Sequence, residues 1–126
     1  MNMIAQLENI VKQLQEWSEE RSLLEKAFEC CRTSLENNER DDKEAGLIAR
    51  WKISDIHLCF DRQSLIFKHS VFSHPFVDTQ IGLYVAAESK GLFQDLQPIG
   101  RYRLITTLGG QLEDDYLIFD DGYYLQ

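Results

Sequence analysis

Residues 54–60 read SDIHLCF, so that an apolar side chain stands at every second position from Ile56 to Phe60. A period of two is typical of a β-strand with one apolar face. Just upstream, Trp51 and Ile53 have the opposite phase, which predicts a bulge where the two runs meet, near position 54. This stretch separates two halves of the chain whose hydrophobic patterns differ.

Downstream of this stretch the alternating pattern recurs. We expect five strands, at residues 54–60, 64–73, 80–87, 99–108 and 111–119. Residues 61–63 form the expected turn between the first two, Pro75 ends the second, and Gly109-Gly110 suits a two-residue hairpin loop. Residues 89–97, before Pro98, are read as a short helix or turn. Because the links are short, the sheet is expected to be mostly antiparallel.

Upstream, residues 1–45 contain neither glycine nor proline and have a helical period. One apolar stripe comprises Ile4, Leu7, Val11 and Leu14, widened by Ile10 and Trp17, and a second comprises Leu24, Phe28, Cys31 and Leu35, with Leu23 and Cys30 beside it. The polar segment 17–22 between them leaves two alternatives, one long helix or two helices that meet near Ser18. One long helix is favoured because this segment has no strong helix breaker. A helix of about 32 residues is roughly 48 Å long, which exceeds so small a domain and suggests contact with a second copy.

These patterns predict a single α+β domain over residues 1–126, with a long N-terminal helix, possibly bent into two, packed on a five-stranded sheet. Its parts are a helical segment at 1–36, a charged linker at 37–50 and a β-rich segment at 51–126. The length agrees with one domain.

The charge balance narrows the class of function. The 126 residues include 13 Lys and Arg against 21 Asp and Glu, a formal net charge of -8. This argues against binding to nucleic acids and to anionic membranes, both of which need clustered basic residues. Residues 1–17 do not resemble a secretory signal, and no apolar run is long enough to span a bilayer. Three cysteines, two of them adjacent, make no disulfide framework and predict reduced thiols in the cytoplasm.

Four residues are candidates for a ligand pocket between helix and sheet. Arg101 and Arg103 share a strand face and could clamp a phosphate or carboxylate, and His57 and His69 could converge with them. The plainer reading is a solvated strand face whose arginines pair with acids on the neighbouring strand.

An acidic cluster is the candidate partner patch. Its members are Glu113, Asp114, Asp115, Asp120 and Asp121. The spacing does not match an EF-hand loop, and charges at both ends of a strand are typical of solubilising residues. The alternative is a surface that docks on a basic partner.

Other combinations carry little chemistry. His57 and Cys59 lie on one strand face about 7 Å apart, too far for a direct nucleophile–base bond. His57, His69 and His74 lack the spacing of a zinc motif. Cys30 and Cys31 fall on a helical stripe and are read as core thiols. We therefore expect no catalytic residue, no metal site and no cofactor.

The resulting hypothesis is a small acidic cytoplasmic protein that binds or regulates another protein, with a homodimer as the expected assembly. An inhibitor of a basic protein surface is one form of it. A small-molecule binder or enzyme with a pocket between helix and sheet is the first alternative, and a structural subunit of a larger assembly is the second. Whether the chain is an enzyme stays open, with a non-enzyme favoured.

Overall fold

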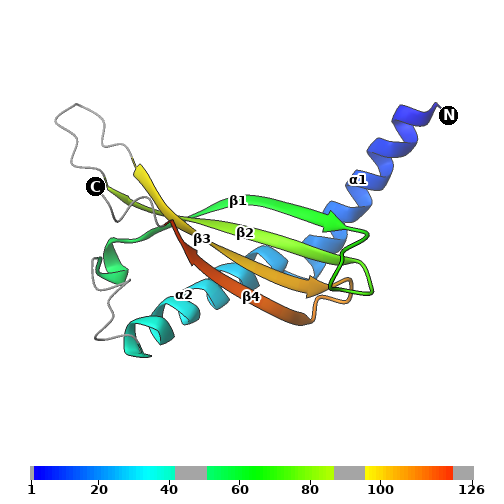
Figure 1. Cartoon of the computed structure of the whole chain (residues 1–126). Coiled ribbons are helices and arrows are strands. Elements are labelled where there is room, and N and C mark those ends of the chain that lie inside the picture. The colour runs from blue at the N-terminus through cyan, green and yellow to red at the C-terminus, as the bar shows by residue number, and fades with distance from the viewer. Residues whose placement is uncertain (1, 42–50, 87–95, 121–126) are drawn as a thin grey trace, which may run out of the picture.

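The fold is known from a computed structural model that describes residues 2–41, 51–86 and 96–120. Its elements are α1 (Met3–Glu20), α2 (Leu23–Asp41), the short 3-10 helix η2 (Ile53–Asp55), β1 (His57–Ile66), β2 (Phe76–Ala86), β3 (Leu96–Thr107) and β4 (Leu112–Phe119). The strands form one sheet in the order β1-β2-β3-β4, each antiparallel to its neighbour (Figure 1). The expected α+β class and antiparallel sheet are confirmed.

The described sheet has four strands, and the expectation of five is wrong. The expected turn at 61–63 lies inside β1, whose register against β2 shifts between Phe60 and Arg62. Asp61 is therefore the extra residue of a bulge, which reverses the alternation without ending the strand. The second expected strand, 64–73, is split between the end of β1 and the loop that leads to β2. Upstream, a 3-10 turn at Ile53–Asp55 replaces the bulge expected near position 54.

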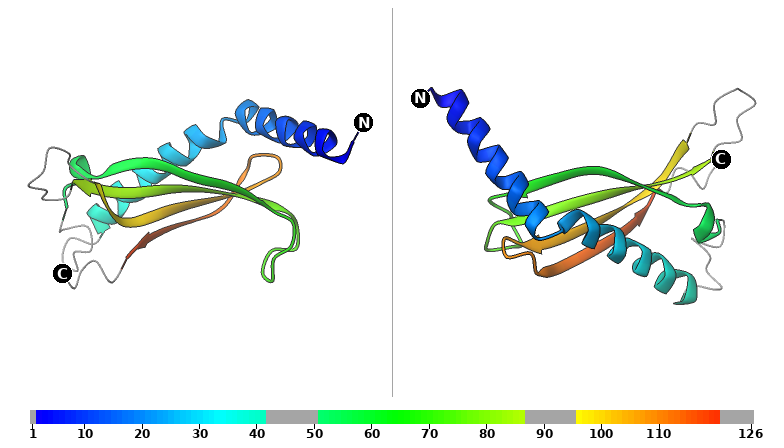
Figure 2. Two further views of the ribbon diagram at one scale, coloured as in Figure 1. Left: turned by 90° about the horizontal axis from the view of Figure 1, so that it is seen from above. Right: turned by 180° about the vertical axis from the view of Figure 1, so that it is seen from behind.

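The N-terminal helices are two, and the favoured single long helix is wrong. The break falls at Ser22, whose φ of 51° is left-handed, a conformation that interrupts an α-helix. The carbonyl of Ser22 then accepts a bond from the amide of Lys26 at 3.0 Å, which starts α2. Ser22 and Glu25 have the S-x-x-E spacing of a helix start, a local signal of this boundary. The two helices consequently run in different directions (Figure 2).

The core lies between α2 and one face of the sheet. The buried row of α2 has four-residue spacing and comprises Leu23, Ala27, Cys31 and Leu35. Three of these residues, Ala27, Cys31 and Leu35, form one cluster with Ile81, Leu83, Val85, Ile99, Tyr102 and Leu104 of the sheet. Of the stripe expected from the sequence, Cys31 and Leu35 are confirmed, whereas Leu24 is exposed and Phe28 only adjoins the core. The buried row is an i, i+4 ridge, the kind of row by which helices commonly pack. It begins at Leu23, one residue before the start of the expected stripe at Leu24.

We call the sheet face toward α2 the helix face and the opposite one the outer face. The loop between β1 and β2, residues 67–75, folds onto the outer face at one end. There Phe76 and Ile105 are buried, and the ring of Phe72 lies 4.9 Å from that of Phe76. The ring of His69 meets Phe76 edge-on at 5.4 Å. The outer face thus has a small aromatic cover at this end of the sheet.

The hairpin between β3 and β4 includes Gly109-Gly110, but its loop is longer than the two residues expected, because the amide of Thr107 donates to the carbonyl of Gln111 at 2.9 Å and residues 108–110 lie between them. Gly110 has a φ of 85°, which residues with a Cβ rarely adopt. Its amide donates to the carbonyl of Thr107 at 3.0 Å. At the other end of β3, a Cβ on Gly100 would overlap the carbonyl oxygen of Ile118 on β4, so only glycine fits there.

Some expectations fall on residues that the structure does not describe. α2 continues to Asp41, beyond residue 36 where the helical part was expected to end. The rest of the charged linker, at 42–50, lies outside the described residues. Most of the short helix or turn expected at 89–97 does so too, although Leu96 and Gln97 belong to β3.

Candidate functional site

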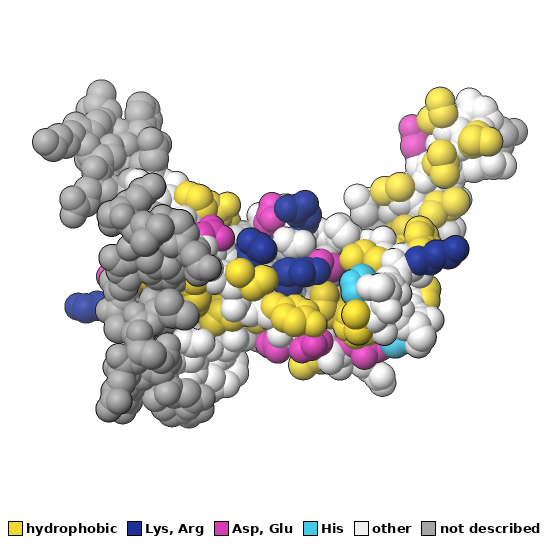
Figure 3. All heavy atoms as spheres, in the orientation of Figure 1, with side chains coloured by type: hydrophobic (Ala, Val, Ile, Leu, Met, Phe, Trp, Pro, Cys, Tyr) yellow, Lys and Arg dark blue, Asp and Glu magenta, His cyan; other side chains and the backbone are white. Residues whose placement is uncertain are grey.

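The most unusual surface of the described chain is the apolar side of α1. α1 has no buried residue, although it carries a stripe of large apolar side chains. Six of them are between 41% and 73% exposed: Met3, Ile4, Leu7, Ile10, Val11 and Leu14. Figure 3 shows hydrophobic side chains along the whole of this projecting arm. Contiguous exposed apolar patches on a protein surface mark interaction sites.

α1 is a well-formed helix despite its exposure. The side chain of Asn2 caps its first turn by accepting a bond from the amide of Ala5 at 2.8 Å. At its other end the guanidinium of Arg21 lies 4.8 Å from the ring centre of Trp17. Isolated helices of this length are marginal in water, so the helix gains from any surface that covers its apolar side.

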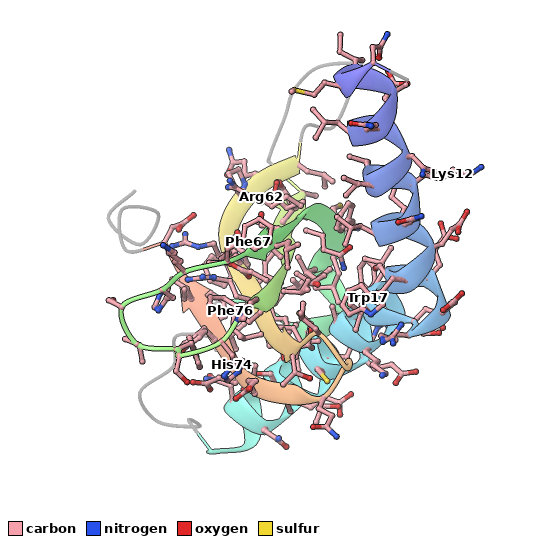
Figure 4. The ribbon with its side chains drawn as sticks, turned by 90° about the vertical axis from the view of Figure 1, so that its right-hand side faces the viewer. Lys12, Trp17, Arg62, Phe67, His74 and Phe76 are labelled. Atoms are coloured by element: carbon pink, nitrogen blue, oxygen red, sulfur yellow. The ribbon has the colours of Figure 1, made fainter. Side chains whose placement is uncertain are left out.

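An apolar groove of about 580 Å³ lies between α1 and the sheet. Figure 4 looks toward this end of the molecule, where Trp17 faces the sheet and Lys12 points away from it. One wall comes from α1 and the other from β1, β2 and the β3–β4 turn. The groove is lined by Val11, Leu14, Gln15, Trp17, Phe60, Arg62, Gln63, Leu65, Val77 and Leu108.

The bulge in β1 is what lets one strand supply both ends of the groove wall. Phe60 and Leu65 are an odd number of residues apart and would point to opposite faces of a regular strand. The extra residue Asp61 restores the phase, so that Phe60 pairs with Ile81 and Leu65 with Val77, on the helix face. The residues that suggested a turn in the sequence thus form a bulge, which lets β1 present Phe60 and Leu65 on one apolar surface.

A chain of polar contacts holds the base of α1 against the sheet. The hydroxyl of Ser18 donates to the amide oxygen of Gln63 at 2.9 Å. The amide nitrogen of Gln63 in turn donates to the hydroxyl of the buried Thr79 at 3.0 Å. A second, more polar cavity of about 460 Å³ is lined by Ser18 at this point and shares Gln15, Phe60 and Gln63 with the apolar groove. The base of α1 is therefore anchored, while its outer half extends beyond the sheet.

The four residues expected to form a ligand pocket are not brought together. His57 begins β1 and His69 follows its end, about 30 Å apart along a strand of ten residues. Arg101 and Arg103 lie on the outer face, opposite α2, because they alternate with Tyr102 of the core. None of the four lines any of the three cavities described among residues 2–41, 51–86 and 96–120.

Both arginines are engaged by acids, as the plainer reading expected, although Arg103 finds its partner on β2. Arg103 donates from Nη2 to Oδ2 of Asp78 at 2.7 Å, and its Nε lies 3.2 Å from the same oxygen. These bonds raise the pKa of Arg103. Gln80 donates to the same carboxylate at 3.2 Å. Arg101 lies 3.7 Å from Asp120. Both arginines of β3 on the outer face are thus paired with a nearby carboxylate, so their charges are locally neutralised (Figure 3).

The acidic cluster on β4 is likewise divided among local partners. Asp115 accepts a bond from the hydroxyl of Tyr102 at 2.7 Å on the helix face. Asp114 accepts one from the hydroxyl of Tyr116 at 2.8 Å, and Glu113 is paired with His74 of the β1–β2 loop. Asp120 faces Arg101, and Asp121 lies outside the described residues.

The thiols and histidines show no activated nucleophile in the described residues. Burial raises the pKa of Cys31 to about 12, and burial together with the nearby Asp115 raises that of Cys30. Both are therefore protonated thiols at neutral pH. Within the same ranges, no group of three or more His, Cys, Asp or Glu side chains is placed to hold a metal ion.

One further property of the site region is a dependence on alkaline pH. Burial raises the pKa of Cys31 from 9.0 to about 12 and also raises the pKa of Tyr102 above its usual 10.0. Burial favours the neutral thiol and the neutral phenol, so the contribution of these groups to stability is complete at neutral pH. It is lost as the pH rises above 9 for Cys31 and above 10 for Tyr102. We expect the free energy of unfolding to fall by up to about 1.4 kcal/mol per pH unit for each group.

Urea unfolding followed by circular dichroism, at several values of pH from neutral to alkaline, measures this slope. The variant Cys31→Ala should have a shallower slope above pH 9 than the wild type. Equal slopes would contradict the role given to Cys31.

Comparison of the chain with protein-family models, with curated proteins and with solved structures gave no match. Separately, neither of the two described helices combines the length and the apolar character that a membrane crossing requires.

Sequence reasoning found part of this site and missed part. The apolar stripe of α1 was recognised, because helical periodicity is local. The groove wall formed by Phe60, Leu65, Val77 and Leu108 was missed, since it depends on strand pairing. The available signal was the change of apolar phase between residues 60 and 65, which was interpreted as a turn.

Proposed function

We propose that this protein is a binding module that docks another protein chain on the apolar side of α1 and the adjoining groove. The observation that best supports this proposal is that α1 exposes six large apolar side chains and has no buried residue. Helix faces of this kind bind by laying i, i+3, i+4 and i+7 anchors against a partner. Ile4, Leu7, Val11 and Leu14 have that spacing.

The α1 surface is a better docking site than the acidic cluster on β4. The described members of that cluster each have a partner within the chain, such as Tyr102 for Asp115 and His74 for Glu113. A charged partner would have to compete with these contacts. A partner that covers the apolar side of α1 displaces only water. Burying this apolar surface stabilises the complex by about 25 cal/mol per Å².

A small apolar ligand is the second candidate, and the groove's volume favours it. About 580 Å³ lies within the range of small-molecule sites, and Gln15, Arg62 and Gln63 supply polar groups at the lining. Such a ligand would leave the outer half of α1 uncovered, with Met3 and Ile4 still in water. A protein partner accounts for the helix and the groove together.

We also propose the cytoplasm as the site of action. Cys30, Cys31 and Cys59 are free thiols, and Cys59 is exposed. An exposed free thiol is best kept in a reducing compartment.

The proposed function is tested by photo-crosslinking from two sides of α1. A benzophenone amino acid replaces Leu7 on the apolar side in one variant and Lys12, which points away from the sheet (Figure 4), in the other. Irradiation in an extract of cells that express the protein should give discrete protein adducts from position 7 and few from position 12. Adducts from both positions alike, or from neither, would contradict the proposal. A small-molecule ligand predicts no protein adduct.

A further inference from the structure

We infer that the partner on α1 is a second copy of this chain, with the two α1 helices packed antiparallel. This inference rests on the proposed function and names the occupant of the same site. Its starting point is the stripe Ile4, Leu7, Val11 and Leu14, which has the 3-4-3 spacing of a helix pair, with β-branched residues and leucines in alternation. Apolar residues at alternating steps of three and four form the seam along which two helices pack.

The stripe is self-complementary when one copy is reversed. It is symmetrical about residue 9, so that in an antiparallel pair Ile4 lies opposite Leu14 of the second copy and Leu7 opposite Val11. The contact is then the same on both copies, as a two-fold dimer requires. It also brings the outer half of each α1 to the groove of the other copy, because Val11, Leu14 and Trp17 form one wall of that groove. The part of α1 that projects beyond its own sheet (Figure 2) would thereby be covered by the sheet of the other copy.

The position of the groove selects the antiparallel arrangement. In a parallel pair the N-terminal half of each α1 would lie beside that of the other copy, and both halves would stay away from the grooves near Leu14 and Trp17. An antiparallel pair brings each N-terminal half to the groove of the other copy. Glu16 and Glu20 do not decide between the two arrangements, because at 3.6 residues per turn they fall on the side of α1 opposite the stripe.

The available surface is large enough for a stable dimer. Six roughly half-exposed side chains of α1, with Phe60 and Leu108 at the groove, leave on the order of 400 Å² of apolar area per copy to be covered. With about 60% of an interface apolar, two copies would bury about 1,300 Å² in total, within the range of stable protein interfaces.

The first test is the solution mass, by multi-angle light scattering and sedimentation equilibrium over a range of concentrations. The wild type should have twice the mass of the 14.7 kDa chain. Leu7→Glu, on the apolar side, should weaken association at least tenfold, whereas the matched control Asn9→Glu, on the polar side, should not. Circular dichroism should show both variants folded, because no residue of α1 is buried. A wild type that is monomeric throughout, or a control that dissociates as readily, overturns the inference.

The second test is the direction of the helices, by disulfide trapping in a Cys59→Ser background that removes the exposed native thiol. Mixing the Leu7→Cys and Val11→Cys proteins under mild oxidation should trap mixed dimers. Preferential trapping of Leu7→Cys with itself would overturn the antiparallel arrangement.

The photo-crosslinking result separates failure of this inference from failure of the proposed function. An adduct from position 7 with twice the mass of the chain supports both. Adducts from position 7 of another mass, with a monomeric wild type, overturn the second copy and leave the docking function standing. A monomeric wild type with no adduct from position 7 overturns both.

Discussion

Replacing Arg103 by methionine is expected to lower the free energy of unfolding by about 3 kcal/mol. The carboxylate of Asp78 is buried, with a side chain only 3% exposed, and Arg103 holds it at 2.7 Å. Arg103→Met leaves that carboxylate in the sheet with only Gln80 as a side-chain donor among the described contacts. The loss is therefore the cost of an uncompensated buried charge, and chemical denaturation of dilute protein measures it.

Two further variants separate this explanation from a general sensitivity of β3. The double variant Asp78→Leu/Arg103→Met removes both charges and should recover most of the stability, because apolar replacement of a buried pair is often neutral. Arg101→Met is the matched control on the same strand face. Its pair with Asp120 is about half exposed on both sides, so it should cost less than about 1 kcal/mol. A double variant as unstable as Arg103→Met would contradict the argument.

Truncating Leu35 on α2 is expected to cost about 3 kcal/mol, whereas the same truncation of Leu7 on α1 should cost less than about 1 kcal/mol. Leu35 is 1% exposed and packs in the core with Cys31 and Tyr102. Leu7 is 54% exposed, so truncating it removes few contacts within its own chain. Leu35→Ala leaves a cavity, and Leu7→Ala only removes surface.

This pair of variants tests the division of the N-terminal segment into a core helix and a docking helix. The measurement is urea unfolding at concentrations low enough for the monomer, so that self-association does not contribute to the stability of α1. Equal losses for Leu35→Ala and Leu7→Ala would mean that α1 belongs to the core, and would remove the basis of the proposed docking surface.

The particular errors of the sequence interpretation share one origin. The single long helix was favoured because nothing at 17–22 breaks a helix by composition, yet Ser22 adopts a left-handed φ and divides it. The extra strand was expected because the apolar phase changes after Phe60, yet a bulge at Asp61 accommodates the change within β1. In both places one residue in an irregular conformation redirects the elements on either side of it.

The candidate site divides in the same way. The exposed stripe of α1 follows from residues three and four apart, and these contact the same surface in any helix. The groove beside it needs β1 and β2 in register, with Leu65 opposite Val77, and the base of α1 held beside them. The predicted clustering of His57, His69, Arg101 and Arg103 assumed a register and a sheet face that the chain does not adopt.

The sequence by itself determined what is local: an α+β chain, helices before strands, a hairpin that includes Gly109-Gly110, and an amphipathic first helix. The tertiary structure alone decided which faces those elements present. It set Asp78 against Arg103, turned both arginines of β3 away from α2, and left the apolar side of α1 without cover. The physical reason is that side chains alternate across a strand, so a shift of one residue in register or a single bulge moves a residue to the opposite face.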